Sequence, residues 1–157
     1  MQFPDTLTVT RHTVLEADAD AVWNALGKPA SFRYVTWPLL RFPALAGRTS
    51  RWQQNDEVVG RVWLLGVVPF SRHHLRLVRL DSDARVLSSD EHGGPIRSWL
   101  HDIEVEPLDG GRCRYTDRVA IDAGGATLPV TAFAWAFYGY RQARWRRLAR
   151  RLASRTG

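Results

Sequence analysis

The spacing of apolar residues along the chain predicts its first elements. Residues 7–15 alternate between apolar and polar side chains and contain many β-branched residues, which predicts a strand. The next segment places apolar residues at helical spacing, with Asp18 or Asp20 as the N-cap and with Gly27 and Pro29 as the stop signal. A strand followed by a short helix is therefore expected first.

The middle of the chain has the pattern of an antiparallel meander. A second short helix is expected over residues 29–34, before Pro38 and Pro43 interrupt regular structure. From residue 48 to residue 122, strand-length runs are separated by turn residues at positions 54–56, 69, 81–84, 93–95 and 109–111. These runs predict about six antiparallel strands.

The last part of the pattern predicts one long helix. It follows the segment AGGATLP and continues to about Ala153, which gives about 27 residues or roughly 40 Å. Its inward stripe at helical spacing consists of Val130, Ala134, Phe137, Arg141, Trp145, Leu148 and Leu152. The sum of these elements predicts an α+β fold, in which a curved antiparallel sheet of about seven strands covers the long helix and leaves a cavity against it.

Length and composition are those of one globular domain. The 157 residues, 45% of them hydrophobic, can bury one substantial core, so a single domain over residues 1–157 is expected. The single cysteine, Cys113, excludes an internal disulfide, and no secretory signal is recognised, so we expect a cytoplasmic protein. Apolar stretches such as VWLLGVVPF are shorter than the roughly 20 residues of a transmembrane helix. Neither a metal nor a cofactor is expected, and the pattern specifies no oligomeric state.

The basic charge of the chain is local to its last helix. The net charge is +6, and the segment after Asp122 has seven arginines and no acidic residue. Subtracting these seven from the 22 basic residues leaves 15 against 16 acidic ones. Nucleic-acid binding is therefore not expected of the domain as a whole. The arginine-rich face predicts either a solvated surface or a contact with an anionic membrane or a partner.

A predicted hairpin brings together two side chains that can carry chemistry. If Leu108 pairs with Arg112 across the turn at 109–111, then His101 and Asp117 become diagonal neighbours on the inner face. Diagonal neighbours lie about 7–8 Å apart at Cα, within reach of their side chains. The inward stripe of the last helix supplies Arg141 to the same region.

The buried Asp117 carboxylate predicts a partner, and Arg141 and His101 are the available ones. Three roles stay open for this constellation. It forms a closed salt bridge that holds the helix to the sheet, it anchors a ligand, or it performs acid–base catalysis in which His101 moves a proton and Asp117 orients it.

The chain resembles the helix-grip superfamily, also called SRPBCC, START-like or birch-pollen-allergen-like. The strings that carry the resemblance are EADADAVWNAL, DEHGGPIRSWLHDIEV, YTDRVAI and FYGYRQARWRRL. The closer similarity is to a bacterial branch of ligand-binding and polyketide cyclase/dehydrase-like proteins. Its recurring motifs correspond here to Gly94-Pro95, Trp99-x-His101, Asp117-x-Val119, and Tyr138-x-x-Arg141 or Tyr140-Arg141.

The resemblance implies that a hydrophobic small molecule, lipid-like or aromatic and polyketide-like, binds between the sheet and the last helix. The expected ligand-binding residues are Trp63, Leu75, Leu77, Trp99, His101, Tyr115, Asp117, Phe137 and Arg141. One alternative is a metal-free cyclase, dehydratase or aromatase that uses His101 and Asp117 for proton transfer. The other is a module that binds a partner or an anionic membrane through its arginine-rich helix face.

Overall fold

A seven-stranded antiparallel sheet and one long helix make up most of residues 5–155, the part of the chain that this computed structural model describes. The elements in order are β1 (Leu7–Leu15), α1 (Ala19–Leu26), α2 (Pro29–Thr36), β2 (Leu40–Arg41), the short 3₁₀ helix η1 (Pro43–Leu45), β3 (Glu57–Leu64), β4 (Val68–Asp81), β5 (Val86–Gly93), β6 (Ile96–Leu108), β7 (Arg112–Asp122), the 3₁₀ helix η2 (Gly124–Ala126) and α3 (Thr127–Ser154). The predicted fold class is confirmed. Among the described helices, none is both long and apolar enough to cross a membrane.

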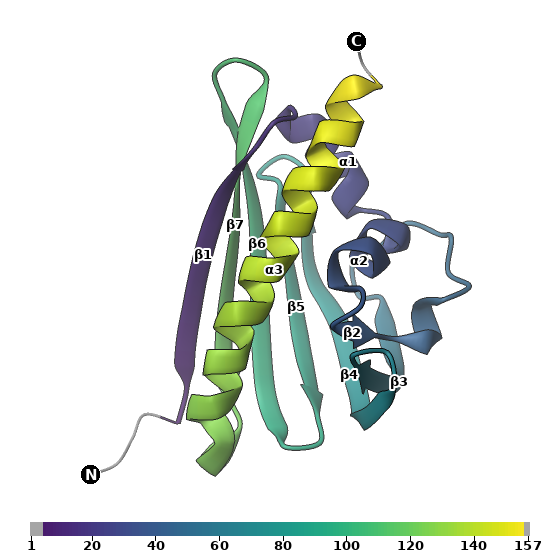
Figure 1. Cartoon of the computed structure of the whole chain (residues 1–157), viewed down its shortest axis with the longest axis vertical. Helices are drawn as coiled ribbons and strands as arrows, with labels where there is room; N and C mark the ends of the chain where they lie inside the picture. The colour runs from purple at the N-terminus through teal and green to yellow at the C-terminus, as the bar shows by residue number, and fades with distance from the viewer. Residues whose placement is uncertain (1–4, 156–157) are drawn as a thin grey trace.

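The strands lie in the order β1-β7-β6-β5-β4-β3-β2, with every neighbouring pair antiparallel (Figure 1). The register of β6 and β7 is the predicted one, since His101 lies opposite Val119 and Ile103 lies opposite Asp117. The side chains of Asp117 and His101 therefore lie on the inner face of the sheet.

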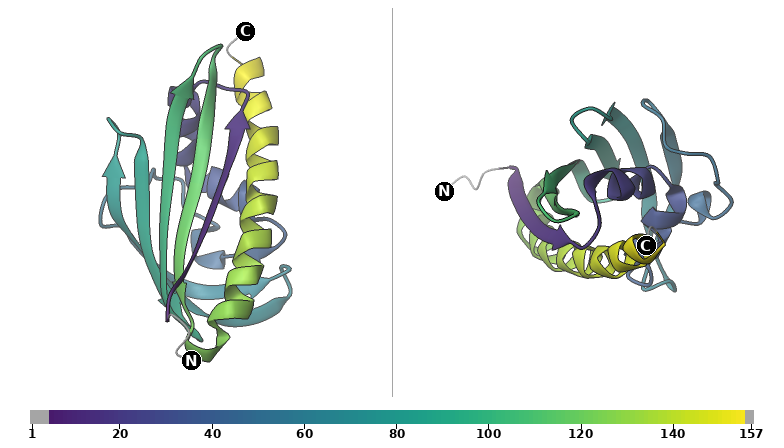
Figure 2. Two further views of the ribbon diagram at one scale, coloured as in Figure 1. Left: turned by 90° about the vertical axis from the view of Figure 1, so that its left-hand side faces the viewer. Right: turned by 90° about the horizontal axis from the view of Figure 1, so that it is seen from above.

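The sheet curls, and α3 runs along its open side (Figure 2). Helix α2 packs against α3, and α1 packs against β6. Asp18 caps α1 as expected, because its Oδ1 accepts a hydrogen bond of 2.8 Å from the backbone N–H of Ala21. Apolar side chains of the inner face and of α3 form two core clusters, one around Trp145 and the other around Phe137.

The meander differs from the prediction in where its strands lie. Only five of the seven strands fall within residues 48–122, and the remaining one after the short helices is β2, which pairs with β3. The expected first turn at 54–56 precedes β3 rather than separating two strands. Two backbone hydrogen bonds join this turn to Leu77 of β4, at 2.8 and 2.9 Å. A two-residue strand such as β2 is too short to show an alternating pattern.

The arginines of α3 divide into two groups. Arg144 donates two hydrogen bonds to the carbonyl oxygen of Tyr34, at 3.1 and 3.0 Å, and its guanidinium lies 4.0 Å from the centre of the Tyr34 ring. Arg146 donates to the Thr13 hydroxyl at 3.0 Å. These arginines hold the helix to its neighbours. Four exposed arginines at the end of α3 and just after it have guanidinium groups that form no hydrogen bond or ion pair with residues 5–155: Arg147, Arg150, Arg151 and Arg155. Of these, Arg151 lies 5.3 Å from the centre of the Tyr34 ring.

The only cysteine is expected to be chemically inert in the folded protein. Cys113 is fully buried, and this burial, with a smaller contribution from Asp18, raises the pKa of its thiol to about 11. Because the thiolate is the reactive form, Ellman's reagent should modify the native chain at least about a hundredfold more slowly than the chain unfolded in denaturant. Equal rates in the two states would contradict the burial of Cys113.

Candidate functional site

A cavity of about 340 Å³ lies between the inner face of the sheet and α3. Its volume is within the range of roughly 300–1,000 Å³ that is typical of small-molecule sites. The walls are mainly apolar and aromatic, and a few polar side chains interrupt them. The polar lining residues are Thr36, His73, Ser89, Glu91, His101 and Arg141, together with the hydroxyl-bearing Tyr138.

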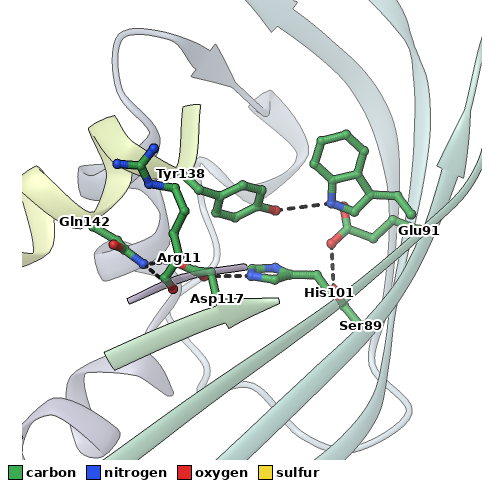
Figure 3. Close-up of polar contacts among 8 residues, drawn as sticks. Arg11, Ser89, Glu91, His101, Asp117, Tyr138 and Gln142 are labelled. Carbon is green, nitrogen blue, oxygen red and sulfur yellow. Dashed lines mark hydrogen bonds and ion pairs between the residues drawn. The ribbon is translucent and has the colours of Figure 1, made fainter. Parts of the chain in front are cut away.

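Asp117 is the centre of a buried hydrogen-bond network behind this cavity (Figure 3). The carboxylate is 1% exposed, and its Oδ1 lies 2.7 Å from Nε2 of His101. Its Oδ2 accepts a hydrogen bond of 3.0 Å from the side-chain amide of Gln142, which also donates to the carbonyl oxygen of Arg11 at 2.9 Å. The network thus joins β1, β6, β7 and α3. Its hydrogen bonds compensate for the burial of the carboxylate.

Of the three roles left open by the sequence, the closed salt bridge between Asp117 and Arg141 is not formed. Asp117 is already satisfied by His101 and Gln142, and across residues 5–155 no hydrogen bond or ion pair reaches the guanidinium of Arg141. Successive residues of a helix point in directions about 100° apart, so Gln142 rather than Arg141 faces the carboxylate. Arg141 lines the cavity instead.

Arg141 is a charged group in an aromatic enclosure. Its residue is 4% exposed, and its guanidinium carbon lies 5.2 Å from the ring centre of Tyr138, with the rings of Phe137 and Phe32 at 5.9 and 6.0 Å. Burial acts to lower the pKa of Arg141, but the surrounding oxygen groups, foremost Tyr115 and Asp117, outweigh it and keep the pKa above its usual value. The guanidinium therefore stays charged, and only cation–π contacts and more distant charges balance it.

A second polar cluster lies on β4 and β5. Glu91 accepts a hydrogen bond of 2.6 Å from the Ser89 hydroxyl, and its other oxygen lies 2.9 Å from Nε2 of His73. Burial alone would raise the pKa of Glu91, but the hydrogen bond and charge of His73 outweigh it and hold the pKa below the ordinary value of 4.5. Glu91 is therefore an ionised and well-paired carboxylate.

Six of the nine residues expected to bind a ligand line the cavity, and their role in binding stays a prediction. These six are Leu75, Leu77, Trp99, His101, Phe137 and Arg141. Asp117 lies behind His101 and does not line the cavity. Tyr115 is covered by Trp145, whose ring centre is 5.2 Å from its own and which lines the cavity in its place.

Trp63, expected to bind the ligand, does not line the cavity. Side chains alternate between the two faces of a strand, and its neighbours Val62 and Leu64 both line the cavity. The Trp63 side chain therefore points away from the cavity.

The sequence pattern did not identify Gln142, Glu91 or Tyr138 as parts of the site. Tyr138 accepts a hydrogen bond of 3.2 Å from the Trp99 indole, and its ring centre is 4.8 Å from that of His101. Burial foremost raises its pKa far above the ordinary value, so its phenol stays neutral. Leu87, Ser89 and Glu91 are two positions apart along β5 and therefore share one face of the strand. Since Leu87 is apolar, this spacing could have predicted that Ser89 and Glu91 lie on the inner face.

The arrangement offers one unpaired cation and two imidazoles on the wall of an apolar cavity. His101 and His73 each have Nε2 held by a carboxylate, which leaves Nδ1 as the ring nitrogen not engaged in these pairs. An imidazole oriented by a carboxylate can transfer protons, and an arginine can bind an anionic oxygen. Within the described chain, no three histidine, cysteine or acidic side chains converge as metal ligands would.

Comparisons with known proteins identify the family and the fold. The model of the family described as "Domain of unknown function (DUF8410)" matches residues 13–152. A search of curated proteins found no match.

Solved structures with the same fold share little sequence with the chain. The aromatase/cyclase ZhuI from Streptomyces sp. R1128 has a TM-score of 0.71 at 14% identity, over 93% of this chain and 94% of its own. Norcoclaurine synthase from Thalictrum flavum in complex with dopamine and hydroxybenzaldehyde has a TM-score of 0.65 at 10% identity, over 91% and 86%. Protein TTHA0849 from Thermus thermophilus has a TM-score of 0.68 at 9% identity, over 96% and 100%. The resemblance to the helix-grip superfamily is thus confirmed at the level of the fold.

The Glu91 cluster on the cavity wall is expected to make folding stability depend on acid pH. Because the folded-state pKa of Glu91 is lowered, its contribution to stability is present above pH 4.5 and is lost as the pH falls through the folded-state value. Glu91→Gln should lower the free energy of unfolding by about 1–3 kcal/mol at neutral pH and flatten its decline in acid. Denaturant titrations at several pH values would measure both effects.

Glu57→Gln is the matched control, since the Glu57 carboxylate is exposed and forms only a long ion pair of 3.8 Å with Arg76. It should change stability little at any pH. An acid decline of the same steepness in Glu91→Gln and in the unsubstituted protein would contradict the role given to Glu91.

Proposed function

The chain belongs to the DUF8410 family of domains, and we propose from its own geometry that it binds a hydrophobic small molecule carrying an acidic group. The acidic group contacts Arg141, and the apolar body fills the cavity between the sheet and α3. Carboxylic acids with an aromatic or lipid-like body are the compounds that fit this description.

The observation that carries the proposal is the unpaired guanidinium of Arg141. A buried charge without a counterion is unfavourable, and the protein itself places no carboxylate of residues 5–155 within ion-pair distance of Arg141. A ligand carboxylate would accept two parallel hydrogen bonds from the guanidinium, the strong geometry of arginine–carboxylate pairs. The other two buried charges of the site, Asp117 and Glu91, already have their own partners.

The walls of the cavity favour an aromatic ligand. Trp99, Phe137, Tyr138 and Trp145 present ring faces and edges to the space that the ligand would fill. Aromatic rings pack with offset or edge-to-face geometry and contribute beyond the area that they bury. Two proteins with the same fold, an aromatase/cyclase and a synthase bound to dopamine and hydroxybenzaldehyde, support this choice by analogy.

A second candidate function is proton transfer on the bound molecule, and the His101–Asp117 pair favours it. His101 lines the cavity, and the carboxylate at 2.7 Å both orients its ring and would stabilise the imidazolium. In this reaction the imidazole removes a proton from the carbon next to a ligand carbonyl, and the bonding electrons form an enolate. The imidazolium then returns a proton to carbon or oxygen, as cyclase- and dehydratase-type reactions require.

The binding proposal is tested with two dyes that differ in one charged group. 1-Anilinonaphthalene-8-sulfonate is an apolar aromatic anion, and N-phenyl-1-naphthylamine is the same ring system without the sulfonate. Arg141→Met should weaken binding of the anionic dye by about 10- to 100-fold, because hydrogen bonds to a charged group are lost, and should leave the neutral dye unchanged. Fluorescence titration measures both affinities.

Arg147→Met is the matched control, since this arginine is exposed and outside the cavity. It should change neither affinity. Arg141→Met should unfold at the same or a higher denaturant concentration than the unsubstituted protein, because no ion pair is broken. Equal losses for the two dyes, or no loss for either, would contradict a charge-specific role of Arg141.

The proton-transfer candidate is tested by hydrogen–deuterium exchange in the aryl ketone α-tetralone. The protein should accelerate exchange at the carbon next to the carbonyl, followed by NMR in heavy water. His101→Gln should lower the accelerated rate by about 10²- to 10⁴-fold while the neutral dye still binds. His12→Gln is the control, since His12 is exposed and outside the cavity. An exchange rate that His101→Gln leaves unchanged would contradict proton transfer by His101, and ligand binding would remain the proposed function.

A further inference from the structure

The cavity reaches the surface at the end of the molecule where α3 begins. Three of its lining residues are themselves exposed, Phe70 at 45%, Phe133 at 44%, and Pro129. They belong to the β3–β4 hairpin and to the first turns of α3, which lie at the same end of the molecule in Figures 1 and 2. We refer to this end as the mouth of the cavity.

Exposed apolar side chains surround the mouth. The tip of the β3–β4 hairpin carries Leu65, Val67 and Val68, which are 61%, 73% and 50% exposed. Hairpin tips ordinarily consist of glycine, asparagine, aspartate or serine, and Leu65 adopts a φ of 53° that a branched apolar residue rarely takes. The mouth rim is the set Trp37, Leu65, Val67, Val68, Phe70, Leu128 and Phe133.

Trp37 belongs to the rim because it lies against the hairpin tip. A Cβ atom added to Gly66 would lie 3.3 Å from the Trp37 ring, which is itself half exposed. Trp37 and the hairpin tip thus form one apolar surface on this side of the mouth, and its side chains are exposed. Exposed apolar patches next to a ligand cavity commonly mark an interaction surface.

The charge of the same segments has a single sign. Two further segments lie against the hairpin and the start of α3: the carbonyl oxygen of Leu39 accepts a hydrogen bond from the backbone of Leu65, and residues 93–98 lie against Ser71 and Gly124. The four segments 36–42, 61–72, 93–98 and 124–133 contain four arginines and no aspartate, glutamate or lysine, and Asp5 and Asp122 lie beside residues 124–127. The four arginines are all exposed: Arg41, Arg61, Arg72 and Arg97. Two of them, Arg61 and Arg72, lie directly opposite each other on adjacent strands, an arrangement that is unfavourable without a nearby anion.

We propose that the mouth rim docks on the surface of an anionic lipid bilayer. A projecting apolar hairpin tip can enter the boundary between head groups and acyl chains, a half-exposed tryptophan suits that interface, and the arginines contact anionic head groups. Any fluid bilayer accepts such a rim, whereas a protein partner would have to match its shape. The cavity would then open toward the membrane, from which an apolar acid could enter it; this use of the surface rests on the proposed binding function.

Vesicle binding tests the docking surface. At low ionic strength, the protein should sediment together with vesicles of phosphatidylcholine and phosphatidylglycerol. A much smaller fraction of it should sediment with vesicles of phosphatidylcholine alone. The double variant Arg61→Gln, Arg72→Gln should lose about 20-fold in affinity for the anionic vesicles. Val67→Asp should lose affinity as well, because a charge at the hairpin tip opposes insertion. A protein that does not bind anionic vesicles would overturn the proposal.

The other end of the molecule provides the matched control. Arg147 and Arg150 are exposed near the C-terminal end of α3, which lies opposite the mouth in Figure 1. The double variant Arg147→Gln, Arg150→Gln removes the same charge and should retain most of the vesicle affinity. A loss as large as that of the mouth variant would overturn the proposal in favour of docking through the arginine-rich face of α3.

A fluorescent dye at the hairpin tip shows whether the tip enters the bilayer or whether the protein is only held at its surface by charge. Because Cys113 is buried, a polarity-sensitive dye can be attached selectively through Val67→Cys, or through Arg150→Cys as the control. The emission of the first should shift to the blue on anionic vesicles, and that of the second should not. The Val67→Asp variant should still bind the anionic dye in solution, so failure of the cavity proposal and failure of the docking proposal give different results.

Discussion

The curl of the sheet lets α3 pack against β1 and β7 but holds β3, β4, β5 and β6 farther from the helix, and the other features of the site follow from this separation (Figure 2). Close packing is reached in two clusters, one around Trp145 and the other around Phe137. Between α3 and strands β3 to β6 the side chains do not fill the space, which leaves the cavity of about 340 Å³. A flat sheet would bring its inner side chains against the helix and fill that space. The apolar stripe of α3 therefore serves both as core and as cavity wall.

This geometry gives Asp117 hydrogen-bond partners within the protein but gives Arg141 none among residues 5–155. Asp117 on β7 is satisfied by side chains from two other elements, His101 of β6 and Gln142 of α3. Arg141, one position before Gln142 on the helix, lines the cavity and lies within about 6 Å of three aromatic ring centres, but its guanidinium forms no hydrogen bond or ion pair with residues 5–155. The same helix thus contributes one polar residue that completes the folded structure and one charged residue that is left for a ligand. Because the two helix residues point in different directions, the Asp117 carboxylate pairs with His101 and Gln142 and does not reach Arg141.

The two ends of the molecule differ in a similar way. Near the end of α3, Arg144 and Arg146 hold the helix to the short helix α2 and to β1, while other arginines stay exposed. At the beginning of α3, the chain instead exposes apolar residues around the mouth of the cavity. The net charge of +6 does not reveal this arrangement, because the arginines of the mouth are scattered over segments that are distant in sequence. Folding brings them together beside an apolar rim.

Those parts of the site that depend on local periodicity can be predicted from the chain alone. The alternation along β6 and β7 and the short turn between them set the register of that hairpin, which brings His101 and Asp117 together. The helical period likewise placed Arg141 on the buried side of α3. Tertiary structure alone decided the partner of Asp117, because that depends on how far α3 is rotated and displaced along the sheet. The Glu91–His73 pair depends on the register of the β4–β5 hairpin, which a bulge between Leu77 and Arg79 shifts, and the alternation of apolar and polar residues does not reveal where a bulge lies.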